Sequence, residues 1–412
     1  MASLRIAPAL RAKAAPSSSR PLVSKRFGHD LIVQPSRNQA PKPVIRNGPP
    51  TGGRSSVSGH TVTVFGCTGF LGRYLVHKIA KAGSRVIVPY RDEDEKRHLR
   101  VMGDLGQIIP MEWDARNPEQ IRECLRYSDM VYNLVGRDWE TRNFNYHDAN
   151  VASAQLIASI AAEHGTPRLV HVSHLNAAPN SASTFYQSKY ESERAVRDAF
   201  PEATIARPAG MYGAEDWYLN AMARYPILYR LNHGRTKVLP VHVLDVAEAL
   251  STMLEAPITS TASTFALPGP AVHTYNSMLS LVASMSMHPP TTAPSVPKPV
   301  AKLFASVINR ALWWPTVSPD EIERKYIDDF GAAALLAEGA EEKPAGWEVA
   351  AEAKQVGVDG EEVKSWKELN IEPDYIEEHA IKYLRRYRSP ANFDQPVELG
   401  HFKPPKHYHV LP

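Results

Sequence analysis

The chain has 412 residues, 43% of them hydrophobic and 22% charged, which suits one large folded unit with appended segments. Its net charge of +3 is weak evidence for nucleic-acid binding, because the first 29 residues carry six basic side chains and no acid, and the rest is mildly acidic. The two cysteines, Cys67 and Cys124, and the lack of CxxC or HExxH spacing argue against a disulfide framework and against a metal site.

The N-terminal residues 1–29 are rich in Arg, Ser and Ala, and they predict a mitochondrial transit peptide. A disordered basic tail is the alternative interpretation. Residues 30–58 are rich in Pro, Gly, Arg and Ser and predict an extended arm. No apolar run approaches the roughly 20 residues of a transmembrane helix, so we expect membrane attachment, if any, to be peripheral.

From residue 60 onwards, expected strands alternate with expected helices. The strands are His60–Phe65, Arg85–Val88, Ile108–Glu112, Met130–Val135, Leu169–Val172 and Thr204–Ala206. The helices are Phe70–Ala82, Asp92–Met102, Pro118–Leu125, His147–Glu163 and Phe185–Ala199. This alternation predicts an α/β fold with a doubly wound parallel sheet, whose strand carboxyl ends share the edge at which ligands bind.

After Tyr212 the alternation becomes less regular. The remaining expected elements are a strand at Thr264–Leu267 and helices at Val241–Leu254, Lys302–Trp314, Pro319–Tyr326 and Tyr375–Arg388. We therefore divide the ordered chain into a Rossmann domain at 59–212, a C-terminal subdomain with interleaved Rossmann elements at 213–330, and an interaction tail at 331–412.

Gly66, Gly69 and Gly72 form a GxxGxxG loop between an expected strand and an expected helix, which is the context that a dinucleotide-binding motif requires. The first glycine permits a tight turn, the second lets the backbone approach a pyrophosphate, and the third lets the helix pack closely. The helix N-terminus then offers N–H groups to the phosphates. A structural glycine turn without a ligand is the alternative.

The residue after the second strand distinguishes NAD from NADP, because an acid binds the ribose 2′-hydroxyl and a base binds a 2′-phosphate. Arg91 stands there, and Arg73, directly after the loop, is a second candidate, so the sequence favours NADP(H). Asp92 is the competing residue and would favour NAD if it turned inward. Asp114 follows the third strand, at a position suited to the adenine amino group.

The catalytic positions of a dehydrogenase are only partly present. A Ser, a Tyr and a Lys four residues after the Tyr share the proton transfer in short-chain dehydrogenases. Ser173 and Lys189 stand at the expected positions, but Phe185 occupies the position of the tyrosine. Tyr186 lies one residue further on, rotated by roughly 100° around the helix. Because a phenyl ring transfers no proton, the site predicts binding without turnover; catalysis by Tyr186 is the alternative.

Several segments together carry a family resemblance. They are GCTGFLG (66–72), VIVPYRDEDE (86–95), MGDLGQI (102–108), EWDARN (112–117), NLVGRDWETRNF (133–144), VHVSHLNA (170–177) and VRDAFPEATIARPAGMYG (196–213). The chain resembles atypical short-chain dehydrogenases over about residues 60–330. It resembles in particular the accessory Rossmann subunits of mitochondrial respiratory complex I, NADH:ubiquinone oxidoreductase.

The resemblance implies a non-catalytic accessory subunit that binds NADPH tightly as a structural ligand. It implies a peripheral place on the matrix side of the inner membrane, in contact with other complex I subunits near the quinone-binding junction of the matrix and membrane arms, where lipid contact is also open. Lys189 would meet the ribose and Pro208 the nicotinamide. The expected cofactor-binding residues are Gly66, Thr68, Gly69, Phe70, Leu71, Gly72, Arg73, Arg91, Asp114, Val135, Gly136, Lys189 and Pro208.

Two rival functions stay open on the same fold. One is an active NADP-dependent reductase or epimerase that uses Tyr186 with Ser173 and Lys189. The other is an organellar RNA-binding protein, against which the acidic charge beyond residue 29 argues, because RNA binding depends on basic surfaces.

Overall fold

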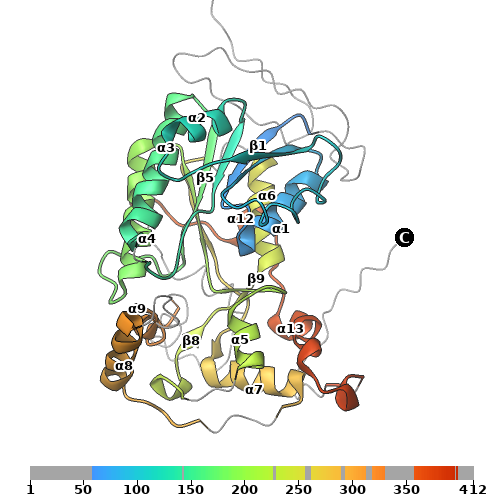
Figure 1. Ribbon diagram of the computed structural model, residues 1–412, viewed down its shortest axis with the longest axis vertical. Helices are drawn as coiled ribbons and strands as arrows, with labels where there is room; N and C mark the ends of the chain where they lie inside the picture. The colour runs from blue at the N-terminus through green and yellow to red at the C-terminus, as the bar shows by residue number, and fades with distance from the viewer. Residues whose placement is uncertain are drawn as a thin grey trace, which may run out of the picture.

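The computed structural model describes residues 58–141, 143–225, 229–255, 261–288, 293–311, 318–329, 357–394 and 396–397. The expected transit peptide and most of the expected arm lie outside these residues. The described chain forms an upper lobe built around a sheet and a smaller lower lobe, which is mostly helical (Figure 1).

The upper lobe contains a seven-stranded sheet in the order β10-β6-β5-β4-β1-β2-β3, and every neighbouring pair is parallel. Its strands are β1 (Thr61–Phe65), β2 (Arg85–Tyr90), β3 (Ile108–Glu112), β4 (Met130–Asn133), β5 (Arg168–Val172), β6 (Thr204–Pro208) and β10 (Thr264–Leu267). The predicted doubly wound parallel sheet is confirmed, and the order reverses between β1 and β4, where such folds bind ligands.

Helices cover both faces of the sheet (Figure 1). On one face lie α1 (Phe70–Lys81), α6 (Val243–Glu255) and α12 (Trp366–Leu369); on the other lie α2 (Pro118–Leu125), α3 (Ser153–Glu163) and α4 (Thr184–Ala199). Val62 and Val64 pack in the first of these layers, while Phe65 packs in the second. Burial on both faces explains why the strands are almost uniformly apolar.

The helix expected at Asp92–Met102 is wrong, because this segment forms a series of turns. Arg97 N–H donates to Asp94 O, and Leu99 N–H donates to Lys96 O, so the bonds span three residues instead of four. The Asp92 carboxylate also accepts the Asp94 N–H at 3.1 Å. Such a local side-chain bond competes with the helical pattern, which the acidic start of the segment had favoured.

The helix expected at His147–Glu163 is present, but its first part is wider than an α-helix. Residues His147–Ala152 form the π-helix η1, which continues directly into α3. Single-turn π-segments are rare and are frequent at functional sites, so this part of the helix is of interest for the ligand edge.

The sequence predicted three helices of the lower lobe, with other bounds, but missed the other two helices named below and the short strands. The helices of this lobe are α5 (Tyr218–Arg224), α7 (Tyr275–Ser286), α8 (Lys298–Ala311), α9 (Pro319–Arg324) and α13 (Ile376–Leu384), with short 3₁₀ turns η2 (Asn232–Gly234), η4 (Arg385–Tyr387) and η5 (Pro390–Asn392). Two small strand pairs join it, β7 (Met211–Tyr212) with β9 (Val241–His242), and β8 (Lys237–Val238) with β11 (His273–Thr274). Its core contains Leu219, Met278 and Ile376, all nearly inaccessible to solvent.

Residues 357–394, within the expected interaction tail, pack on both lobes. The Trp366 side chain is fully buried, and its Nε1–H donates to Pro268 O at 2.8 Å. Arg197 of α4 pairs with Glu361 at 2.7 Å and with Asp359 at 2.9 Å. This part of the tail therefore completes the fold, and contact with partners stays a prediction for the segment.

Candidate functional site

The glycine loop lies between β1 and α1, at the carboxyl edge of the central strands. Gly66 has a φ of +80°, which a residue with a side chain adopts only with strain. Gly69 N–H donates to Gly66 O at 3.1 Å and closes the turn, and Gly69 is the N-cap of α1. No side-chain hydrogen bond caps this helix start within the described residues, which leaves the N–H groups of its first turn available to a phosphate at the ligand edge.

The glycines differ in what a side chain would meet. A Cβ on Gly72 would lie 2.3 Å from Gly66 O and 2.6 Å from Cys67 Cα, so α1 can reach the loop only with a glycine here. A Cβ on Gly69 would meet Gly66 O at 3.2 Å and no other atom within 4 Å. Gly72 is therefore required by packing of the fold, whereas Gly69 leaves open backbone, which fits close approach of a phosphate.

The positions expected near the adenosine lie along the same edge. Arg91 is exposed directly after β2, whereas the neighbouring Asp92 carboxylate is engaged by the Asp94 N–H. Arg73 is partly buried; its guanidinium donates to Thr68 O at 3.4 Å and lies 3.7 Å from Glu215 Oε1. The Asp114 carboxylate accepts the Arg116 N–H at 2.9 Å in a turn after β3. Arg91 is thus the cation with freedom to meet a 2′-phosphate.

Lys189 is the centre of the second half of the site. It lies on α4, and a Cβ on Gly136 would lie 2.7 Å from its Nζ, so the loop after β4 passes directly beside the ammonium. Burial lowers the pKa of Lys189 to about 8, against the opposing attraction of Glu193 and Asp138. The Lys189 ammonium contacts no hydrogen-bond acceptor among the described residues, so it can donate to the hydroxyl oxygens of a ribose.

Asn150, on the π-helix η1, supports this arrangement. Its Oδ1 accepts the Arg137 N–H at 3.0 Å, and its Nδ2 donates to Ser188 Oγ at 3.0 Å. It therefore ties the loop after β4 to α4, next to Lys189. The sequence analysis missed this residue, and the only signal for it was a polar Asn in the otherwise apolar face of a long helix.

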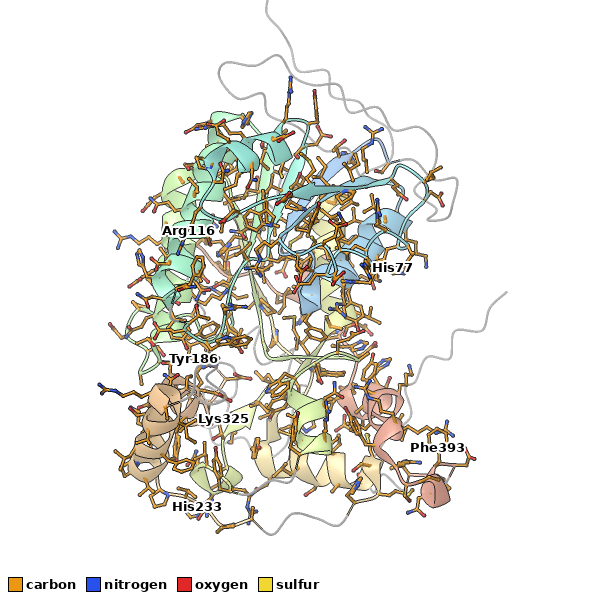
Figure 2. All side chains as sticks on the ribbon, in the orientation of Figure 1. His77, Arg116, Tyr186, His233, Lys325 and Phe393 are labelled. Atoms are coloured by element: carbon orange, nitrogen blue, oxygen red, sulfur yellow. The ribbon has the colours of Figure 1, made fainter. Side chains whose placement is uncertain are left out.

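Phe185 and Tyr186 point to different surroundings. The Phe185 ring lies 5.9 Å from Lys189 Nζ, in the position from which a tyrosine would act with the lysine. The Tyr186 ring instead packs on His174, with ring centroids 4.9 Å apart, and burial raises its pKa to about 12. Helix α4 begins at Thr184, so no slip of the helix start moves Tyr186 onto the face of Lys189. Tyr186 lies where the upper lobe meets the lower lobe (Figure 2).

Residues of the lower lobe cover the ring of Phe185. The Arg324 guanidinium lies 4.8 Å from the centre of the Phe185 ring and donates to Asp138 O at 2.7 Å. Ile327 packs against the cluster formed by Tyr146, Phe185 and Tyr186. The space beside Phe185 is therefore filled by the chain's own side chains. Arg324 is 139 residues from Phe185 in the sequence, and no local pattern revealed this contact.

Ser173 and two histidines complete this edge. Ser173 follows β5 and is buried, and its Oγ has no hydrogen-bond partner among the described residues. His171 bonds to Ser192 Oγ at 3.1 Å, and burial next to Lys189 lowers its pKa to about 3. His174 likewise has a pKa lowered to about 3 by burial. Neither histidine gains a proton near neutral pH, so neither offers a replacement general acid.

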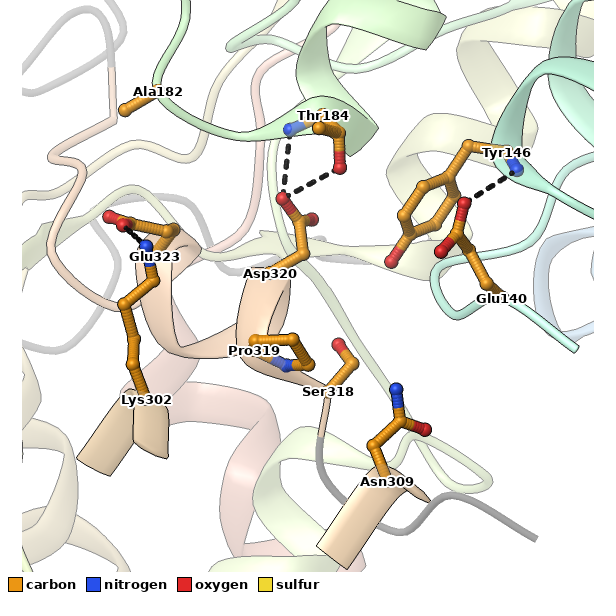
Figure 3. Close-up of a pocket in the computed structure, with 10 residues that line it drawn as sticks. All are labelled: Glu140, Tyr146, Ala182, Thr184, Lys302, Asn309, Ser318, Pro319, Asp320 and Glu323. Atoms are coloured by element: carbon orange, nitrogen blue, oxygen red, sulfur yellow. Dashed lines mark hydrogen bonds and ion pairs between the residues drawn. The ribbon is translucent and has the colours of Figure 1, made fainter. Parts of the chain in front are cut away.

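A cavity of ≈ 250 Å³ lies beside the start of α4 and is lined partly by α8 and α9 (Figure 3). Asp320 of α9 accepts the Thr184 N–H at 2.8 Å and also contacts the Thr184 hydroxyl. The Asp320 carboxylate thereby caps α4 from the other lobe. Neither the glycine loop nor Lys189 lines this cavity, so it is separate from the dinucleotide edge.

His242, Asp374 and His379 bring one ligand atom each within 4.8 Å of the others. The two imidazole rings are stacked, however, with centroids 4.5 Å apart and an angle of 12° between their planes. A metal ion binds a nitrogen lone pair in the plane of the ring, and it cannot lie in both of these planes. This group therefore joins α13 to β9 without forming a metal centre in this arrangement.

Comparisons with known proteins show which proteins this chain resembles in sequence. The NAD dependent epimerase/dehydratase family matches residues 62–265. The NADH-ubiquinone oxidoreductase 40 kDa subunit, mitochondrial, of Neurospora crassa is 41% identical over 92% of this chain and 93% of its own length. NADH dehydrogenase [ubiquinone] 1 alpha subcomplex subunit 9, mitochondrial, of Rattus norvegicus is 36% identical over 90% of this chain and 91% of its own length.

A solved structure supports the fold. The Citrobacter sp. triphenylmethane reductase complexed with NADP(H) aligns with a TM-score of 0.53 and 16% identity, over 78% of this chain and 99% of that chain. In the described residues, no helix is both long enough and apolar enough to cross a membrane.

Proposed function

The chain belongs to the family of the 40 kDa and alpha subcomplex 9 subunits of mitochondrial complex I, and we propose that it is a non-catalytic accessory subunit that holds one NADPH as a structural ligand. The proposal is supported by the contrast between two parts of the ligand edge. The glycine loop leaves its backbone open, whereas side chains fill the space beside Phe185. The helix start after the loop has no side-chain cap among the described residues, while Phe185 stands in place of the proton donor and is covered by Arg324 and Ile327.

The choice of NADPH over NADH rests on Arg91. Its side chain is exposed after β2, where a 2′-phosphate would lie, and Asp92 is engaged by its own turn. The proposed contacts are the loop at Gly66–Arg73 with the pyrophosphate, Asp114 with the adenine, Lys189 with the ribose and Pro208 with the nicotinamide. Val135 and Gly136 would line the adenosine side.

A ligand of this kind stabilises the folded subunit. Binding only to the folded state adds about 4 kcal/mol when the ligand concentration is a thousandfold above Kd. We expect this contribution to matter most during assembly, before partner subunits cover the chain. The proposed place is the matrix side of the inner membrane, near the quinone-binding junction of the two arms, with other complex I subunits as partners.

The rival function, a reductase or epimerase using Tyr186, is opposed by the direction of that side chain. Its ring packs on His174, its pKa is raised to about 12, and it is not on the helix face of Lys189. Turnover through Tyr186 requires α4 to rotate, and this would break the cap that Asp320 gives to Thr184.

The test is to denature the purified assembly and identify the nucleotide that is released. We expect NADPH in a one-to-one ratio with this chain. Gly69→Ala should lose nucleotide and reduce incorporation into complex I, whereas Gly210→Ala should retain both, because a Cβ at Gly210 meets no atom within 4 Å and has no φ strain. Intact assembly without nucleotide would refute the proposal. A carbonyl-reducing activity that Tyr186→Phe abolishes would favour the rival.

A further inference from the structure

Segment 318–329 of the lower lobe, which we call the latch, is bonded to three separate parts of the ligand edge. Its Asp320 carboxylate accepts the Thr184 N–H at 2.8 Å, in the first turn of α4 (Figure 3). Its Arg324 guanidinium donates to Asp138 O at 2.7 Å, in the loop after β4. The Asp320 and Arg324 side chains are only 12 and 16% exposed, so solvent screens these charged contacts little.

The third contact joins the end of the latch to the loop after β5. Asn176 Nδ2 donates to Asp329 Oδ1 at 2.8 Å, and the other carboxylate oxygen of Asp329 accepts the Leu239 N–H at 2.7 Å. Both oxygens are therefore engaged, and the end of the latch is fixed. Directly before Asn176, Leu175 N–H donates to Pro208 O at 2.9 Å. The latch is thus connected to the strand end that is proposed to meet the nicotinamide.

The residues proposed for the nicotinamide half are nearly closed to solvent. Lys189 is only 7% exposed, and Pro208 is also buried. The Phe185 ring lies 5.9 Å from Lys189 Nζ, and the latch residues Arg324 and Ile327 cover that ring. Because so little of Lys189 is accessible, a dinucleotide can reach its ammonium, or leave it, only when the surrounding elements move apart.

The latch is also anchored in its own lobe. Ile322 packs with Ala301 and Ala305 of α8, and Asp328 accepts the Lys237 N–H at 2.8 Å. A movement of the lower lobe away from the sheet would therefore break the three contacts with the ligand edge together, while the contacts within the lobe persist.

We propose that the latch controls exchange of the dinucleotide: it must release α4 and the loops after β4 and β5 before the bound nucleotide can leave. This latch deepens the proposed function and rests on it, because it gives a physical reason for retention of the nucleotide. Release passes through a locally opened state, whose population the three contacts set. By thermodynamic reciprocity, bound nucleotide must in turn make the opened state less populated.

The test measures how fast NADPH leaves the full chain, from its fluorescence after addition of excess NADP⁺. Arg324→Met keeps the length of the side chain but removes the donor to Asp138 O. It should speed release at least about tenfold, the factor expected for one charge-assisted hydrogen bond. Asp320→Ala should also speed release. Arg324→Lys can still donate to Asp138 O and should keep most of the slow release.

The matched control is Glu321→Gln. Glu321 lies on the same helix, and its ion pair, at 3.9 Å, is with Lys325 inside the latch. This variant should release NADPH at the wild-type rate. A second control uses adenosine 2′,5′-bisphosphate, which lacks the nicotinamide and its ribose. It should leave the wild-type and Arg324→Met chains equally fast, whereas a generally loosened fold would release both ligands faster.

Hydrogen exchange of the wild-type chain tests the latch without a substitution. The Thr184 and Leu239 amides donate to carboxylates of the latch, whereas the Thr61 amide donates to Asp129, outside it. Removal of the nucleotide should speed exchange of the first two amides by a larger factor than exchange of the Thr61 amide. Equal factors would contradict the latch.

The outcomes separate the latch from the proposed function. Equal NADPH release from the wild-type, Arg324→Met and Asp320→Ala chains would overturn the latch and leave the structural-ligand proposal standing. Faster release of both ligands from the Arg324→Met chain would likewise show that Arg324 acts only through general stability. A wild-type chain that binds no NADPH would end the proposed function, and the latch with it.

Discussion

The two halves of the ligand edge have been shaped differently. Around β1 and α1, the glycine loop keeps bare backbone, and its helix start has no internal cap. Around β5 and α4, side chains fill the corresponding space: Phe185 lies between Lys189 and Arg324, and Ile327 packs beside it. On the proposed function, binding a dinucleotide and reacting with it therefore depend on separate elements of one fold.

This separation has a physical basis. Phosphate binding uses backbone N–H groups, which persist as long as the turn persists, whatever the neighbouring side chains. Proton transfer depends on one hydroxyl at one position, and its loss costs about 10²- to 10⁴-fold in rate without disturbing the fold. The catalytic half is therefore the one that can be lost while the protein remains folded and liganded.

The largest expected effect concerns the ion pair that stabilises the filled half. Arg207 of β6 and Glu193 of α4 form two hydrogen bonds, at 2.9 and 2.6 Å, and Glu193 is fully buried. Glu193→Gln should lower the free energy of unfolding by about 3–5 kcal/mol, because it leaves a buried guanidinium without its counter-charge. Chemical denaturation checks this.

The control is Glu248→Gln, which removes the partner of Lys78 at the surface and should cost less than about 1 kcal/mol. Equal losses in the two variants would contradict the idea that α4 is fixed to the sheet by a buried pair.

A second loss of stability is expected in the open half of the ligand edge, which is the glycine loop between β1 and α1. Gly72→Ala places a methyl group 2.3 Å from Gly66 O, so α1 must move away from the loop. We expect a loss of about 1–3 kcal/mol in the free energy of unfolding, together with loss of bound nucleotide. Thermal unfolding and nucleotide release measure the two parts, with Gly210→Ala as the control. A Gly72→Ala chain with normal stability would show that the loop tolerates displacement.

The pH dependence tests the packing around Lys189. His171 has a folded pKa of about 3 and an ordinary value near 6.5, so between these values the unfolded chain binds the extra proton. Stability should therefore fall as the pH drops below 6.5. Relative to His171→Gln, the wild-type chain should lose about 1.4 kcal/mol per pH unit between pH 6 and 4.

Comparing the two chains removes the contribution of Asp216, whose burial raises its pKa to about 6 and which acts in the opposite direction. Parallel stability curves for the two chains would mean that His171 is hydrated in the folded state.

The smallest expected effect is on activity, and it tests most directly whether side chains close the space beside Phe185. Phe185→Tyr restores the tyrosine four residues before Lys189, but Arg324 and Ile327 still cover the ring. We expect no carbonyl-reducing activity above that of the wild-type chain, as followed by NADPH absorbance. Phe185→Leu serves as the control for altered packing. Turnover in the Phe185→Tyr chain would show that substrate reaches this face.

The sequence predicted the parts that depend on local pattern. Alternating apolar strands and amphipathic helices identified the sheet, and β3, α2 and β10 have the expected bounds. The acidic segment after Arg91 was wrongly expected to be a helix, because Asp92 bonds its own backbone instead.

The covering of Phe185 by Arg324 and the burial of Trp366 could not be predicted, because both join segments far apart in the chain. For the same reason Asn150 became meaningful only once η1 lay beside α4.

The central claim is that NADPH here is held and not oxidised. Its most direct test loads complex I with NADPH that carries deuterium at the transferable position of the nicotinamide, and then lets the complex oxidise NADH with ubiquinone. After many turnovers the nucleotide is released by denaturation and analysed by mass spectrometry. We predict one NADPH for each copy of this chain, with the deuterium retained. Loss of the deuterium, or recovery of NADP⁺, would contradict a purely structural role.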